Sequence, residues 1–137
     1  MQNSINFVPS TGQVIFNGSS AQTIDMPDNF SNLTIANTAG VVSLIGNSQL
    51  RVSGTLTINN EANFDINGKN LRKNASTTNP VTLVNNGNLQ LQGNETVYIT
   101  PDTDSGTVTY DGSGATGLAA GNLSLIHISE PTRLEPI

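Results

Sequence analysis

The chain of 137 residues contains no cysteine and no tryptophan, and only 4 % of its residues are aromatic. The absence of cysteine excludes disulfide bonds and thiolate metal sites. Charged residues make up 11 % of the chain, about half the usual share, and five lysines and arginines stand against ten acidic residues, giving a net charge of −5. That balance lacks the basic footprint of proteins that bind nucleic acid or an anionic membrane surface.

Long hydrophobic runs are also missing. No apolar stretch approaches the roughly 20 residues that a membrane-spanning helix needs, so membrane insertion is not expected. Residues 1–10 have neither a basic n-region nor an apolar h-region, so we predict no signal peptide there. Histidine occurs once, at His127, in a C-terminal stretch that is discussed below.

The residues that are abundant point to β-structure. Nineteen Asn, 16 Thr, 13 Ser and 13 Gly account for 61 of the 137 residues. These residue types form helices poorly, which argues against a helical bundle. The low net charge and the β-branched residues argue equally against ordinary disorder.

A repeated strand pattern organises the chain. Three segments read apolar, Thr, apolar and end in Asn, and they follow one another at nearly regular intervals: Leu33–Asn37, Leu56–Asn60 and Val81–Asn86. The alternation predicts strands with one buried face. We expect the following side chains to face the interior: Leu33, Ile35, Leu56, Ile58, Val81 and Leu83. We expect the side chains of Thr34, Thr57 and Thr82 to face the solvent.

Two further apolar sets follow each of these segments after Asn- and Gly-rich corners. The second sets are Val42/Leu44, Phe64/Ile66 and Leu89/Leu91, and a glycine follows each of them, at Gly46, Gly68 and Gly93. The third sets are Leu50/Val52, Leu71 and Val97/Ile99. Strands this short bury a core only when coils stack on one another. The sequence therefore predicts an all-β fold, a right-handed parallel β-helix (β-solenoid) with about three short strands per coil of about 22–26 residues.

A longer repeat suggests how the chain is divided. Val14–Ser19 recurs near the end of the repeat region as Val108–Ser113. We therefore assign residues 1–122 to a solenoid fragment, with one large unit over about 13–107 and the start of a second over 108–122.

The stretches Val14–Ile24, Phe30–Ile35 and Leu50–Ile58 resemble the repeat regions of secreted and cell-surface proteins of bacteroidete-type bacteria. Those proteins look like β-solenoid stalks or adhesins, and they often end in a sorting domain of the type IX secretion route. The resemblance covers about residues 13–114. It implies a secreted or cell-surface location.

The C-terminal stretch Leu123–Arg133 resembles the translation of a transposase-type sequencing adapter. We therefore expect residues 123–137 to be a non-native tail, with the native part ending near Asn122 and belonging to a longer gene. Residues 129–137 are then expected to be exposed. The alternative is a genuine last strand over 123–128.

Catalytic groups are scarce in the native part. Without His127 there is neither His nor Cys to form a nucleophile–base pair. Paired carboxylates act as acid and base in glycosidases, and polysaccharide-degrading enzymes do use β-helices. Asp65 lies between two inward residues and is expected to point outward, with Ser43 and Gln90 at its level in the neighbouring coils. No acidic cluster is predicted, so we expect no enzyme activity and no cofactor.

Three binding candidates remain, each with a simpler explanation. Asp102 and Asp104 resemble the opening of a calcium loop, or they form an ordinary turn after Pro101. Thr34, Thr57 and Thr82 form one outward file that orders water, or they are β-branched residues suited to a strand surface. Arg51, Lys69, Arg72 and Lys73 form a basic spot in which Arg72 and Lys73 contact an acidic polysaccharide, or they form a solvated corner.

Two function classes follow. The first is a structural or adhesive stalk of a large surface protein, whose partners are surface polysaccharide or neighbouring repeats of the same chain. The second is a carbohydrate-binding or polysaccharide-degrading module on the same fold. An enzyme needs acids or bases gathered in one cleft under long loops, and the corners here are short. The stalk is therefore the preferred interpretation.

Overall fold

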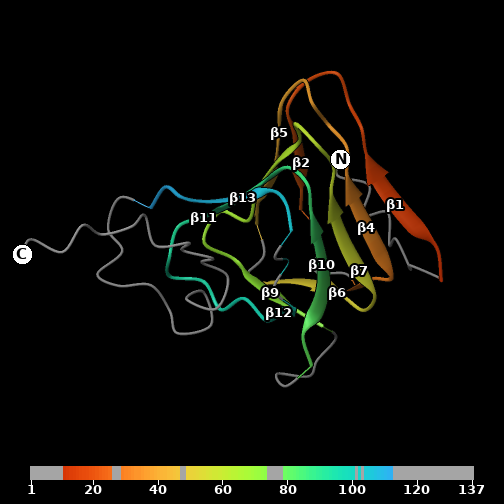
Figure 1. Ribbon diagram of the computed structural model, residues 1–137, viewed down its shortest axis with the longest axis vertical. Helices are drawn as coiled ribbons and strands as arrows, with labels where there is room; N and C mark the ends of the chain where they lie inside the picture. The colour runs from red at the N-terminus through yellow and green to blue at the C-terminus, as the bar shows by residue number, and fades with distance from the viewer. Residues whose placement is uncertain are drawn as a thin grey trace, which may run out of the picture.

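The computed structural model describes residues 11–25, 29–46, 49–73, 79–100, 102 and 104–112. These residues wind into a parallel β-solenoid of about four turns built from three sheets (Figure 1). The predicted all-β parallel solenoid with three strands per coil is confirmed. The predictions for the tail at 123–137 and for His127 lie outside the described residues.

Each sheet collects one strand from successive coils, and every pairing is parallel. Sheet A consists, in spatial order, of β1 (Gln13–Phe16), β4 (Asn32–Ile35), β7 (Thr55–Ile58), β10 (Val81–Asn85) and β12 (Ile99–Thr100). Sheet B consists of β2 (Gln22–Ile24), β5 (Val41–Leu44), β8 (Asn63–Asp65), β11 (Asn88–Leu91) and β13 (Thr107–Tyr110). Sheet C consists of β3 (Asn29–Phe30), β6 (Gln49–Val52) and β9 (Asn70–Arg72).

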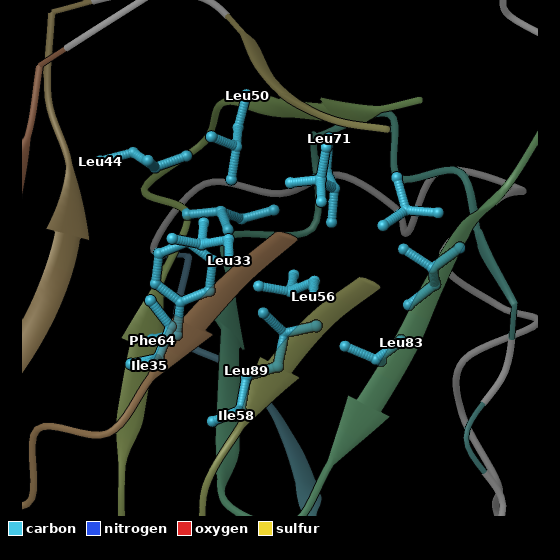
Figure 2. Packing of buried hydrophobic residues seen from close by; sticks show 14 of the residues in the cluster. Leu33, Ile35, Leu44, Leu50, Leu56, Ile58, Phe64, Leu71, Leu83 and Leu89 are labelled. Carbon is cyan, nitrogen blue, oxygen red and sulfur yellow. The ribbon is translucent and has the colours of Figure 1, made fainter. Parts of the chain in front are cut away.

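The core forms where the inward side chains of the three sheets meet. Along each strand, alternate residues point inward, so that apolar residues of consecutive coils stack on one another. Sheet A contributes Leu33 and Leu56, which are register partners, and sheet B contributes Phe64. Figure 2 shows these side chains converging with Leu50 and Leu71 of sheet C. All six residues predicted to face the interior are buried: Leu33, Ile35, Leu56, Ile58, Val81 and Leu83.

Glycines with left-handed backbone angles form the corner between sheets B and C. Gly46, Gly68 and Gly93 have φ angles of 77°, 71° and 97°. Only glycine adopts such angles without steric cost from a Cβ atom. The glycine that follows each second apolar set therefore allows the chain to turn out of sheet B at equivalent positions of these three coils.

Buried asparagines support the corner between sheets A and B. Asn37 is fully buried; its Nδ2 donates to the Ser20 carbonyl at 2.6 Å, and its Oδ1 accepts from the Ala39 and Gly40 amides at 2.9 and 3.0 Å. Asn85 likewise donates to the Thr107 carbonyl at 3.0 Å and accepts from the Gly87 amide at 3.2 Å. Each amide thus satisfies backbone groups at the corner and ties neighbouring coils together.

The register of the third repeat differs from the sequence alignment by two residues. Leu56 pairs with Leu83 rather than with Val81, and Thr57 pairs with Val84 rather than with Thr82. A slip of two residues keeps every side chain on its face, so the alternation alone does not fix it. The coil from Leu56 to Leu83 is accordingly two residues longer than the alignment indicates.

Gly87 explains this shift. The preceding coil turns from sheet A to sheet B through a longer corner, in which Glu61 has a φ of 65° and Ala62 is fully buried. The next coil makes the same turn at Gly87, packed so closely that a Cβ atom there would collide with the carbonyl oxygens of Asn59 and Ala62. Because this corner is two residues shorter, the chain turns after Asn85, which lies opposite Ile58 at the end of β7.

The predicted threonine file is therefore not formed. Thr34 and Thr57 are register partners, but the next position belongs to Val84, while Thr82 pairs with Thr55 and with Thr100. Thr34, expected in solvent, is only 6 % exposed because Gln13 covers it and donates from Nε2 to its hydroxyl at 2.6 Å.

Coil length also varies more than expected. Val14 pairs with Leu33 and Val81 pairs with Ile99, so both of these coils are shorter than any coil predicted from the sequence. Ile99, expected to share a strand with Val97, instead begins the next coil as part of β12, while Val97 bridges to Leu71. The longer repeat begins in β1 of sheet A and recurs in β13 of sheet B. The unit boundaries at about 13–107 and 108–122 stay a prediction.

Replacing Gly87 tests the tight corner. We expect Gly87→Ala to lower the free energy of unfolding by about 1–3 kcal/mol, the usual cost of forcing an atom into packed structure. The matched control is Gly12→Ala, since a Cβ at Gly12 meets nothing within 4 Å. Urea unfolding followed by circular dichroism measures both. Equal stability of the two variants would contradict the proposed role of Gly87.

Candidate functional site

The described cations gather at sheet C. Arg51 lies on β6 and Arg72 on β9, and Lys69 and Lys73 immediately flank β9. The outward positions of sheet C, continued by Thr96 and Tyr98 in the next coil, are called the sheet C face below. No carboxylate occupies an outward position of the sheet C face among the residues that the structure describes. This acidic chain therefore carries its described positive charge on one side.

Two guanidinium groups occupy adjacent rungs of this face. Arg51 and Arg72 are register partners in the parallel pairing of β6 with β9. Neighbouring strands lie about 4.8 Å apart, so two like-charged side chains project from adjacent rungs of one face. The side-chain amide of Gln49, with its oxygen assigned to the side that faces Arg51, accepts from Nη2 at 2.6 Å and from Nε at 3.3 Å. This contact orients Arg51 without neutralising it.

The ring of Tyr98 contacts the guanidinium group of Arg72. The Cζ atom of Arg72 lies 5.9 Å from the centroid of the Tyr98 ring, within the range of a cation–π interaction. Tyr98 takes this place because the Leu71–Val97 bridge puts it at the level of Arg72 in the next coil. The Nε atom of Arg72 is buried and finds no acceptor among the described residues.

The outer face of sheet A brings the threonine candidates into two rows. Thr34 and Thr57 share a row with Ile15 and Val84, which are 51 % and 38 % exposed. Thr55, Thr82 and Thr100 form the second row. These rows are uncharged, and apolar Ile15 and Val84 limit the first row to the two adjacent threonines Thr34 and Thr57.

Asp102 and Asp104 lie together at the corner between sheets A and B. Asp102 accepts from the Asn85 amide at 2.5 Å through Oδ2, and from the Asp104 amide at 3.5 Å through Oδ1. Its hydrogen bond and its negative charge raise the pKa of Asp104 above the usual value. Asp102 thus caps β10 and its turn. Among the described residues no group of three His, Cys, Asp or Glu side chains is arranged to hold a metal ion.

Asp65 and Glu95, which were considered for acid–base catalysis, accept hydrogen bonds from backbone amides. Asp65 is half-buried on the outer face of sheet B with Ser43 and Gln90 as register partners, which confirms its expected surroundings. Glu95 is fully buried and accepts from the Gln92 and Gly93 amides at 2.5 and 2.7 Å. It therefore caps the turn at Gly93.

An open hollow lies at the corner between sheets A and B. It is lined by Asn60, Glu61, Asn63, Asn86, Asn88 and Thr107. Its side chains are mostly amides with a single carboxylate, whereas glycoside cleavage uses two.

Sequence reasoning identified the cations of the sheet C face but missed their partners. Arg72 and Lys73 were considered either as a polysaccharide contact or as a solvated corner; Arg72 lies on an outward strand position, and Lys73 follows the strand end. Gln49 and Tyr98 were missed. Their outward positions follow from alternation about Leu50 and Val97. Gln49 lies two residues before Arg51 on the same strand, whereas only the register shows that Tyr98 contacts Arg72.

The chain matches no family model, no curated protein and no solved structure. In the described part of the chain there is no helix that is long and apolar enough to span a membrane.

Asp65 provides a test of the electrostatics of sheet B. Burial raises its pKa, the Asn67 amide that it accepts at 2.7 Å lowers it, and the charges of Asp111 and Glu95 raise it further, with a net upward shift. A raised carboxyl pKa means that ionisation destabilises the folded state, an effect that is complete above the folded pKa and absent below the unfolded one.

We therefore expect Asp65→Asn, which keeps the acceptor for Asn67, to be as stable as the parent or up to about 0.5 kcal/mol more stable at pH 7, since solvent screens this partly exposed group. At pH 3 the two proteins should be equally stable. Urea titrations at both pH values measure this. A variant that is clearly less stable than the parent at pH 7 would contradict the argument.

Proposed function

We propose that this chain is a structural or adhesive repeat segment of a large secreted or cell-surface bacterial protein, acting as a stalk or surface-binding solenoid without catalysis of its own. The observation that carries the proposal is the continuity of the stack. Sheets A and B each run through five strands in uniform parallel register. One apolar core, including Leu33, Phe64 and Leu89, extends along the same axis.

A stack of this kind suits a spacer for a physical reason. Each coil makes its hydrogen bonds and apolar contacts mainly with the coil before and the coil after it. Adding a coil lengthens the axis by about 4.8 Å and creates one more copy of the same interface. Length is thereby set by the number of coils, which is what a stalk requires.

The surface location rests on the resemblance of residues 13–114 to repeat regions of secreted and cell-surface proteins of bacteroidete-type bacteria. The lack of cysteine is compatible with that location, because the core and the corner asparagines stabilise the fold without disulfide bonds. Neighbouring repeats of the same chain are then the natural partners along the axis.

The alternative is a carbohydrate-binding or polysaccharide-degrading module. The unbalanced positive charge of the sheet C face favours the binding half of this alternative. Glu95 is occupied in capping the turn at Gly93, and the register partners of Asp65 are Ser43 and Gln90, so neither carboxylate favours the degrading half.

Inserting one extra coil tests the stalk. A second copy of residues 33–55 placed after Thr55 adds one complete coil, because Leu33 and Leu56 are register partners. We expect the protein to keep its β-sheet circular dichroism and its melting temperature, and to gain about 4.8 Å in length by small-angle X-ray scattering. The control is an insertion of half that segment, which breaks the register. If the full-coil insertion unfolds the protein as the half-coil insertion does, the proposal fails.

Incubation with neutral and acidic polysaccharides distinguishes the two functions. Because the carboxylates of Glu95 and Asp102 accept from backbone amides at turns, we expect the purified chain to release no reducing ends and no unsaturated uronates. Reductant-based colorimetry and absorbance at the unsaturated-uronate band measure the two products. Sustained product release that scales with protein concentration would favour the degrading module.

A further inference from the structure

We propose that the sheet C face is a binding site for an acidic polysaccharide, in which Arg51 and Arg72 each pair with a sugar carboxylate. This inference goes beyond the structural role proposed above. It does not depend on that role, because the coils present this face whether or not the chain serves as a spacer.

Arg51 and Arg72 carry positive charge that their contacts with Gln49 and Tyr98 do not neutralise. Arg51 and Arg72 are register partners on adjacent rungs, and like charges on directly opposed strand positions repel each other. Their partners, the Gln49 amide and the Tyr98 ring, orient the guanidinium groups but leave the charge intact. Anionic groups over this pair replace the repulsion with attraction.

The sheet C face is the outer surface of a parallel sheet, so its charged side chains repeat along the solenoid axis at the strand spacing of about 4.8 Å. A small anion gains little on such an open strip. A linear polymer that lies along the axis makes several weak contacts at once, and linked contacts multiply in affinity.

Arginine presents a planar fork that matches a carboxylate, whereas lysine presents a single point charge. The neighbouring amides of Gln49 and Asn70 occupy the same face and suit sugar hydroxyls. Four cations in a chain of net charge −5 are a poor match for the dense phosphates of nucleic acid, but they suit a polymer with at most one charge per sugar.

The experiment measures retention of the full chain in native gels cast with polygalacturonate or alginate, against dextran as the neutral polymer. The test variant is Arg51→Gln with Arg72→Gln. The matched control is Thr57→Glu with Thr82→Glu, which changes net charge by the same two units on the outer face of sheet A. Thermal melting followed by circular dichroism establishes that each variant is folded.

We expect the parent chain to be retarded by at least one uronate polymer and not by dextran, and the retardation to weaken with added salt. The double glutamine variant should lose at least tenfold in apparent affinity, and the double glutamate control should bind within a factor of about two of the parent. Arg72→Lys keeps the charge but loses the fork and the full ring contact, so we expect it to bind several-fold more weakly.

Other results overturn the proposal. Absence of retardation by both uronate polymers would remove it. Equal losses in the glutamine and glutamate variants would show that net charge alone is responsible. Full binding by Arg72→Lys would contradict the fork-to-carboxylate pairing. Tighter binding to heparin or to single-stranded DNA than to either uronate polymer would assign the face to sulfates or phosphates instead.

Discussion

The structure depends on one constraint: each strand in this chain makes its sheet hydrogen bonds to the same sheet position in a neighbouring coil. Strands of two to five residues have too little surface to form a core by themselves. Stacking in parallel register pairs the backbone groups of each strand. It also builds a shared core, because it places Leu33 directly against Leu56 along the interior. The corners can then differ in length, provided that each brings the chain back into register with the strand of the neighbouring coil. The short coil from Val81 to Ile99 and the long coil from Leu56 to Leu83 therefore fit in one stack.

Much of the fold could be predicted because its signals are local. Alternation identified the inward faces, and the glycines at Gly46, Gly68 and Gly93 marked one corner before their left-handed angles were known. The register of β10 could not be obtained in this way, since a two-residue slip preserves alternation. The missing information was a close approach in space, the contact of Gly87 with two carbonyl oxygens of the preceding coil.

The same distinction applies to the surfaces. Arg72 was recognisable as a cation on an outward position, because alternation around Leu71 requires it. Its pairing with Arg51 and its contact with Tyr98 are properties of stacking, and coil spacings of unequal length conceal them in the sequence. The threonines show the opposite case. Thr34, Thr57 and Thr82 look equivalent along the chain, but the register separates Thr82 from the other two.

Parallel pairing has a consequence for assembly. Since every strand points the same way within its sheet, the surface presented by β1 at one end of sheet A is not the surface presented by β12 at the other. Two molecules that pair through these edges would do so head to tail, in a heterologous contact. The resulting dimer would again have two different ends. Pairing between these two edges would therefore propagate along the axis, whereas the self-complementary patch of a closed twofold dimer has to come from a side of the rod.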